Sequence, residues 1–310
     1  MKALAEYIVR GRWQAVLVTA ACGAMTFLLP PFSTMLNYLA AAAVALVTLH
    51  VGLLQGLQVL LIAAVMTVLF YQLLGIQSVV VAVMVLLLWL PCWALAAVLQ
   101  ATHRLDRVLM AAVLFGAAIL LGVYGLLGDP VPWWVERLQA LQEMLDDAGL
   151  PVTNLSDEQL LHDVAALMTG LVLASLLIGV LGSLMLARWW QSRLVHPGGF
   201  REEFCSLRLG YPAGLLTLAV MLAARFVSGS AGELIAQLAM IMLVPYLLVG
   251  LAVVHSLVRQ TGRSSAWLAV IYVLLAIIPQ ATLLLAGGGL LDTWVDFRRR
   301  VRAKDGGDGQ

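Results

Sequence analysis

The sequence predicts an all-α fold, a polytopic transmembrane helical bundle with about 8–10 membrane segments and interfacial amphipathic helices. Of its 310 residues, 62% are hydrophobic and only 11% are charged, and the mean hydropathy is +0.97. Charged residues make up about a quarter of a soluble domain. The apolar runs are continuous, unlike the alternating strands of a β-barrel, and they reach about 20 residues, the length of a membrane-crossing helix. We predict that residues 1–310 form a single integral membrane domain.

The N-terminal segment predicts a cytoplasmic start and a first span. Basic residues concentrate on the cytoplasmic side of membrane proteins. The run that follows, 14–29, is apolar and ends at a double proline, which favours an uncleaved span over a removed signal peptide. The charges before it are Lys2, Arg10 and Arg12 against Glu6.

Residues 35–70 predict a tight pair of short helices. Their length corresponds to about 54 Å of helix, slightly less than two upright crossings of about 30 Å each. The Gly52-x-x-x-Gly56 spacing predicts close helix packing at these two glycines. Polar and small residues interrupt the run in its middle, namely His50, Gly52, Gln55, Gly56 and Gln58.

Two further spans are predicted at 79–100 and 108–127, joined by a basic loop. The loop contains Arg104 and Arg107 against Asp106, so we place it in the cytoplasm.

The segment 128–163 predicts an acidic extracytoplasmic insertion. It has eight acidic residues against Arg137 alone. Apolar residues recur at helical spacing from Trp134 to Ala148, which indicates an amphipathic helix lying at the interface, with Trp133 and Trp134 as anchors.

The next elements alternate between the two sides of the membrane. A sixth span over 164–187 leads to a basic cytoplasmic loop over 188–208. Spans over 211–227 and 233–257 follow, joined by an outer turn. Within the basic loop, one helical face predicts a surface-lying helix that docks a partner; the docking residues are Phe200, Arg201, Glu202, Glu203, Phe204 and Arg208.

The last apolar stretch, 265–297, is predicted to be a broken hairpin. A single crossing would put the arginines that follow Phe297 outside, against the positive-inside rule. A turn at Pro279 or at the triple glycine 287–289 returns the chain to the cytoplasm. Residues 301–310 would then form a disordered cytoplasmic tail.

Candidate solute-binding residues lie in the two interrupted hairpins, because interrupted apolar segments in both halves of a chain indicate a transporter site. Asp292 and Asp296 are one helical turn apart and could bind a cation. The alternative is that they form the polar face of a terminal helix, with Asp296 paired to Arg300. The full set of candidates is Asn37, Gln55, Gln58, Gln280, Asp292 and Asp296.

A second candidate pair flanks the outer turn. Arg225 and Glu233 could form a buried ion pair at a substrate site. The alternative is that Ser230 and Glu233 form a capping box and Arg225 extends to the membrane surface.

Motifs for other functions are missing from the sequence. The three cysteines and the histidines lack metal-ligand spacing, so we expect no metal and no cofactor. No nucleophile elbow, Walker motif or dinucleotide fingerprint is present, and we predict that the protein is not an enzyme. A net charge of +1 does not indicate nucleic-acid binding.

Three segments carry a resemblance to a known family. The residues from Val44 to Gly56, from His196 to Gly210 and from Gly289 to Arg300 look like the uncharacterised bacterial membrane proteins of the YybS-like family. That family is distantly similar to the substrate-binding S components of energy-coupling-factor transporters. The resemblance implies a bacterial inner-membrane location and small-molecule capture with a membrane or ATPase partner subunit.

Two hypotheses for the function follow from these features. The first is a transport component that binds a small solute in the lipid bilayer. The alternative is a non-catalytic membrane scaffold that docks a cytosolic or membrane partner. Both place the N-terminus and the C-terminus in the cytoplasm of a multi-pass protein.

Reporter fusions test the predicted topology. Fusions after Gly262 and after Lys304 should both report the cytoplasm, because the hairpin between them returns the chain to its starting side. A fusion after Glu143 should report the outside. An external signal at Lys304 would show that 265–297 crosses only once.

Overall fold

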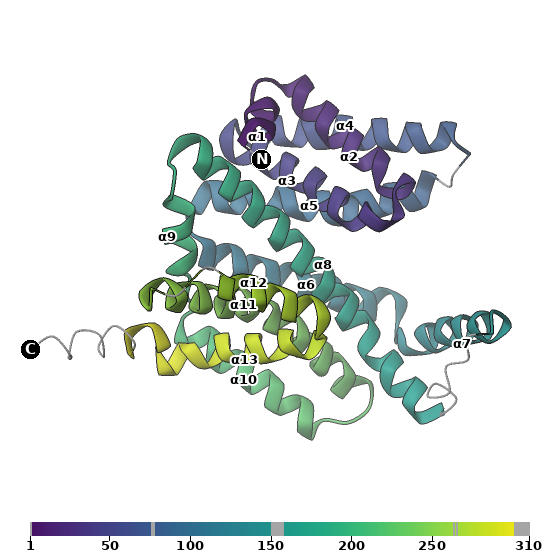
Figure 1. Ribbon diagram of the computed structural model, residues 1–310. Helices are drawn as coiled ribbons and strands as arrows, with labels where there is room; N and C mark the ends of the chain where they lie inside the picture. Colours follow the sequence, from purple (N-terminus) through teal and green to yellow (C-terminus); the bar gives the residue numbers. More distant parts are fainter. Residues whose placement is uncertain (1, 76–77, 150–157, 263, 265, 301–310) are drawn as a thin grey trace, which may run out of the picture. The chain divides into compact units, whose positions relative to one another are not determined.

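The computed structural model describes residues 2–75, 78–149, 158–262, 264 and 266–300, and this part of the chain is almost entirely helical (Figure 1). It contains thirteen α-helices, one 3₁₀-helix and no β-strand, which confirms the predicted all-α class. The predicted tail 301–310 lies outside the described residues. Six of the described helices are long and apolar enough to cross a membrane: Ser33–His50, Leu53–Leu73, Val81–Thr102, Leu105–Leu127, Glu158–Val195 and Ser230–Gln260.

The chain groups into two compact units. Unit 1 comprises residues 1–112 and 176–207, and unit 2 comprises 113–175 and 208–310. Two helices, α6 (Leu105–Leu127) and α8 (Glu158–Val195), contribute residues to both units. The single integral membrane domain stays a prediction.

Unit 1 is built around helix α3 (Ser33–His50), in which every residue from Ala40 to Leu49 is buried. Four alanines open this segment, and small side chains let neighbouring helices approach closely. Helices α2 (Arg12–Leu28), α4 (Leu53–Leu73) and α5 (Ser78–Thr102) pack side by side with α3 (Figure 1). The unit also holds α1 (Lys2–Val9), η1 (Pro30–Phe32) and α9 (Gly199–Cys205), with the adjoining parts of α6 and α8.

The predicted helix pair at 35–70 is present as α3 and α4, but both helices are longer than expected. Only Val51 and Gly52 separate them, so each reaches spanning length. Gly52 has φ +145° and precedes α4, so its role is in the turn. Gly56 is buried, and a Cβ there would lie 2.9 Å from the Cβ of Thr48, so α3 and α4 approach closely at this glycine.

Unit 2 contains the predicted amphipathic helix as α7 (Val131–Asp147). Its apolar face packs within the chain: Trp134, Val135 and Leu138 contact a buried cluster that includes Ala165 and Ala166 of α8. Trp134 Nε1 also donates a hydrogen bond of 2.8 Å to Thr169 Oγ1. The exposed Trp133 remains the anchor candidate.

The rest of unit 2 is formed by α10 (Tyr211–Phe226), α11 (Ser230–Gln260), α12 (Ala266–Ile277) and α13 (Pro279–Val295). Helices α12 and α13 run in opposite directions (Figure 1), as the broken hairpin predicted. The break falls at Ile278, and the triple glycine lies inside α13. Pro279 suits this break because a proline fits the first turn of a helix.

Glycines hold α13 against α11. A Cβ at Gly250 would collide with the backbone oxygen of Leu285, and a Cβ at Gly289 would collide with the backbone oxygen of Tyr246. A Cβ placed at Gly288 would meet no atom of another helix within 4 Å. Of the triple glycine, Gly289 therefore makes the close approach.

This contrast predicts opposite effects for two neighbouring substitutions. Gly289→Ala should destabilise the protein by about 1–3 kcal/mol, the cost of overpacking a tight contact. Gly288→Ala should be neutral or stabilising by up to about 1 kcal/mol, because alanine is the better helix former. Thermal unfolding of both purified variants checks this, and equal melting temperatures would contradict the assigned contact.

Candidate functional site

The predicted solute-binding residues of unit 1 do not converge. Asn37 Oδ1 accepts a 2.8 Å hydrogen bond from Trp89 Nε1, so this amide joins α3 to α5. Gln55 and Gln58 lie exposed on α4. These three residues provide no shared set of buried polar atoms in the described structure.

In unit 2, Gln280 is exposed, and Asp292 forms a buried ion pair. Arg298 Nη2 donates to Asp292 Oδ2 at 2.7 Å, and only 4% of each residue's surface is exposed. The backbone N–H of Phe297 donates to the other carboxylate oxygen at 2.9 Å. Asp296, with φ +46°, ends α13 in a left-handed conformation between the paired residues.

Asp296 binds a different arginine from the one predicted. Arg208 Nη1 and Nη2 donate to its two carboxylate oxygens at 2.9 and 2.6 Å. This pairing holds the pKa of the Asp296 carboxyl below its ordinary range. Its stabilisation is present at neutral pH and is lost as the pH falls below about 4. The predicted side-chain pair with Arg300 is wrong, because α13 ends before Asp296.

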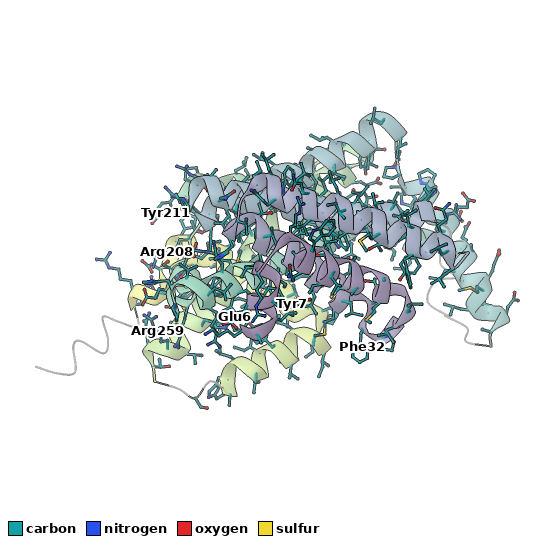
Figure 2. All side chains as sticks on the ribbon, turned by 90° about the horizontal axis from the view of Figure 1, so that it is seen from above. Glu6, Tyr7, Phe32, Arg208, Tyr211 and Arg259 are labelled. Carbon is teal, nitrogen blue, oxygen red and sulfur yellow. The ribbon has the colours of Figure 1, made fainter. Side chains whose placement is uncertain are left out.

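The two carboxylates therefore act as parts of an ionic cap on α13. Both already face a guanidinium group, which disfavours the cation site considered for them. Figure 2 shows Arg208 and Arg259 at the same end of unit 2, where α10 begins and α11 ends. The cap belongs to this basic end.

Most of the predicted docking residues in unit 1 have intramolecular roles. Phe200 and Phe204 stack with their ring centroids 5.7 Å apart. Arg188 Nε donates to Glu203 Oε2 at 2.9 Å, which ties α9 to α8. Arg201 and Glu202 are exposed.

A polar site that was not predicted from the sequence surrounds Gln237 of α11. The Gln237 side chain is fully buried. Its Nε2 donates to the carbonyl oxygen of Ala166 at 2.6 Å and to the hydroxyl of Tyr124 at 3.0 Å. The carbonyl acceptor fixes the orientation of the amide, because the amide oxygen would repel it. Side chains from α6 and α11 and the backbone of α8 thus meet at one point.

Two buried acceptor atoms at this site lack a hydrogen-bond partner among the described residues. They are Gln237 Oε1 and Glu233 Oε2. Residues four apart on a helix lie on the same face, with Cβ atoms about 5–6 Å apart. We call the side chains of Glu233, Gln237 and Tyr124, with the Ala166 carbonyl, the Gln237 site.

Both sequence interpretations of Glu233 fail in the described structure. No ion pair joins it to Arg225, which is exposed. Gly229, not Ser230, caps α11, and it makes no side-chain capping bond. A first-turn acid is favoured by the helix dipole whatever its partner, so Gln237 is the stronger evidence for a site.

Neighbouring residues fix the Gln237 site in place. A Cβ at Gly170 would lie 2.8 Å from the Cβ of Gln237, so this glycine lets α8 approach α11. Asp129 Oδ1 accepts from the backbone of Val131, and Ser230 Oγ donates to Asp129 Oδ2 at 3.4 Å. The start of α7 and the start of α11 are joined in this way.

The sequence contained one signal for this site. Gln237 is the only amide side chain in the apolar run from Leu234 to Val253. A polar residue inside a span is costly in the bilayer and marks a functional position. Its acceptor, Ala166, lies 71 positions away, and periodicity does not identify such a partner.

The chain matches the family described as predicted membrane protein (DUF2232) over residues 17–293. No curated protein matches the chain, and no solved structure does.

The ionic cap predicts unequal effects for two matched substitutions. Asp292→Asn should destabilise the protein by about 3–5 kcal/mol, because it leaves the buried Arg298 charge without its carboxylate. Asp296→Asn should cost less than about 1 kcal/mol, since its partner Arg208 is 49% exposed and asparagine tolerates the left-handed backbone.

Thermal unfolding in detergent measures both changes. A fall in melting temperature of the same size in the two variants would contradict the different burial of the two pairs.

Proposed function

The chain belongs to the family of predicted membrane proteins DUF2232, whose function is not established, and we propose that it is a membrane transport component. In this proposal it binds a small solute at the Gln237 site and performs no enzymatic reaction. The site lies in unit 2 and replaces the six residues proposed from the sequence.

The observation that carries the proposal is the unpartnered amide oxygen of Gln237. The side chain has no exposed surface. Its amide nitrogen donates two hydrogen bonds, whereas its amide oxygen accepts none from the described residues. A buried polar group without a hydrogen bond costs about 1–3 kcal/mol. A solute that donates to this oxygen would remove that cost, which supports a binding role for the site.

The charge distribution in unit 2 supports the proposed orientation. Arg208 and Arg259 lie toward the end where α10 begins and α11 ends (Figure 2). Arg298 follows the end of α13, where it binds Asp292. Asp129 and Glu233 lie toward the opposite end, where α6 finishes and α11 begins. By the positive-inside rule, the first end is cytoplasmic and the Gln237 site is nearer the outer face.

The resemblance to YybS-like proteins and S components extends this proposal. It would place the protein in a bacterial inner membrane with a separate ATPase subunit. The chain has no Walker motif, so energy for transport would come from such a partner or from an ion gradient.

The scaffold function receives less support from the described contacts. Glu203 and Arg208 are engaged within the chain. Arg201 and Glu202 remain exposed on α9, so they are the residues through which a partner would dock.

A ligand screen with a matched pair of variants tests the transport proposal. At least one solute of a broad panel should raise the melting temperature of the purified protein, because ligands that bind the folded state stabilise it. Gln237→Leu should abolish this shift, since leucine has a similar volume and no acceptor. Gln260→Leu, at the other end of α11, should keep it.

The melting temperature of each variant without ligand controls for folding. Loss of the shift in both variants, or its retention in Gln237→Leu, would refute binding at the Gln237 site.

A further inference from the structure

We propose that the solute of the Gln237 site is a small organic cation that carries N–H donors, such as a primary ammonium ion. This inference rests on the proposed function, because it names the chemistry of the ligand for the same site. Three features of unit 2 support it: the hydrogen-bond polarity of the site, the unpaired charge of Glu233 and the acidic helix beside it.

The unpartnered oxygens of the Gln237 site require a ligand that donates hydrogen bonds. The two donors of the Gln237 amide group face Ala166 and Tyr124. The two buried atoms of this site that have no partner among the described residues, Gln237 Oε1 and Glu233 Oε2, are both acceptors when the carboxyl is ionised. They are one helical turn apart on the same face of α11. An ammonium group has three N–H donors and can serve both.

The charge at the site requires a cation. Within the described residues, no arginine or lysine forms an ion pair with Glu233 or with the nearby Asp129. The two arginines of this region are directed elsewhere: Arg225 is exposed, and the guanidinium of Arg137 lies 5.3 Å from the Trp133 ring. A carboxylate with a buried oxygen is stabilised by a cationic partner, and these side chains supply none.

A metal ion fits the described residues less well than an organic cation. Hard divalent cations collect about six or more oxygen ligands. The site offers two unpartnered buried oxygens, and the described part of the chain has no group of three or more acidic, histidine or cysteine side chains suited to a metal. Two acceptors match the directional N–H bonds of an ammonium ion.

The acidic helix α7 lies next to the site. Its Trp134 bonds to Thr169 of α8, one helical turn from the Ala166 carbonyl that binds Gln237. Charge of one sign around a site raises the local concentration of the oppositely charged ligand. Along its length α7 carries Glu136, Glu143, Asp146 and Asp147 against Arg137.

Binding of defined salts to the purified full-length protein tests the inference. Ethylammonium chloride should raise the melting temperature. Tetramethylammonium chloride, which has the charge but no N–H donor, should not, and neither should sodium chloride or sodium acetate at equal ionic strength.

Glu233→Gln should weaken ethylammonium binding by about tenfold or more, the effect of losing a hydrogen bond to a charged group. Glu136→Gln, the same change at an exposed position of α7, should leave the affinity within about twofold at physiological ionic strength, where exposed charges are screened.

The outcomes separate this inference from the proposed function. If a neutral or anionic solute stabilises the wild type and Gln237→Leu abolishes that effect, the site stands and the cation class is wrong. Equal stabilisation by ethylammonium, tetramethylammonium and sodium would also overturn the class. If no solute stabilises the wild type, both the inference and the proposed function fail.

Discussion

The constraint that governs this structure is the need to satisfy polar groups without water. An apolar bilayer offers no hydrogen-bond partners, so each polar atom in a span must find one within the protein. Side-chain hydroxyls meet this need locally: those of Thr48, Thr67 and Thr217 each donate to the carbonyl four residues earlier. Longer links do the same between helices, as where Trp89 donates to Asn37. Among the described residues a few buried polar atoms lack a partner, and Gln237 Oε1 is distinguished because its whole side chain is buried and the buried Glu233 Oε2 lies one helical turn away.

The same constraint explains why the two aspartates at the end of α13 have a structural role. Asp292 is buried, and a buried carboxylate is strongly destabilising unless it is paired and hydrogen-bonded. The left-handed turn at Asp296 brings Arg298 and the N–H of Phe297 back to it. Asp296 then binds Arg208 across unit 2. Two residues that look like a cation site in the sequence thus fasten the end of a helix to its own continuation and to the segment before α10.

Local patterns predicted the elements of the fold but not their contacts. Apolar run lengths located the helices, and the charge pattern located the broken hairpin and the amphipathic helix α7. Periodicity identifies which face of a helix is apolar, but not which other helix covers it. The Arg208–Asp296 pair spans 88 positions and the Gln237–Ala166 bond spans 71, so neither follows from residues close in sequence. Within unit 1, Asn37, Gln55 and Gln58 do not meet, because the polarity of a residue does not show which side chains become its partners.

Helix α12 shows what surroundings unit 2 requires. Its twelve residues give about 18 Å of helix, too short to cross a hydrocarbon layer of about 30 Å. None of them is buried, although the helix is apolar throughout, and Trp267, Val270 and Val273 are each about half exposed. In water such a surface would be unfavourable by about 25 cal/mol for each Å² of apolar area. The neighbouring α13 already occupies the close-packed face of α11 through its glycine contacts. An apolar environment outside unit 2 must therefore cover α12, and the bilayer offers one without requiring that this helix span the membrane.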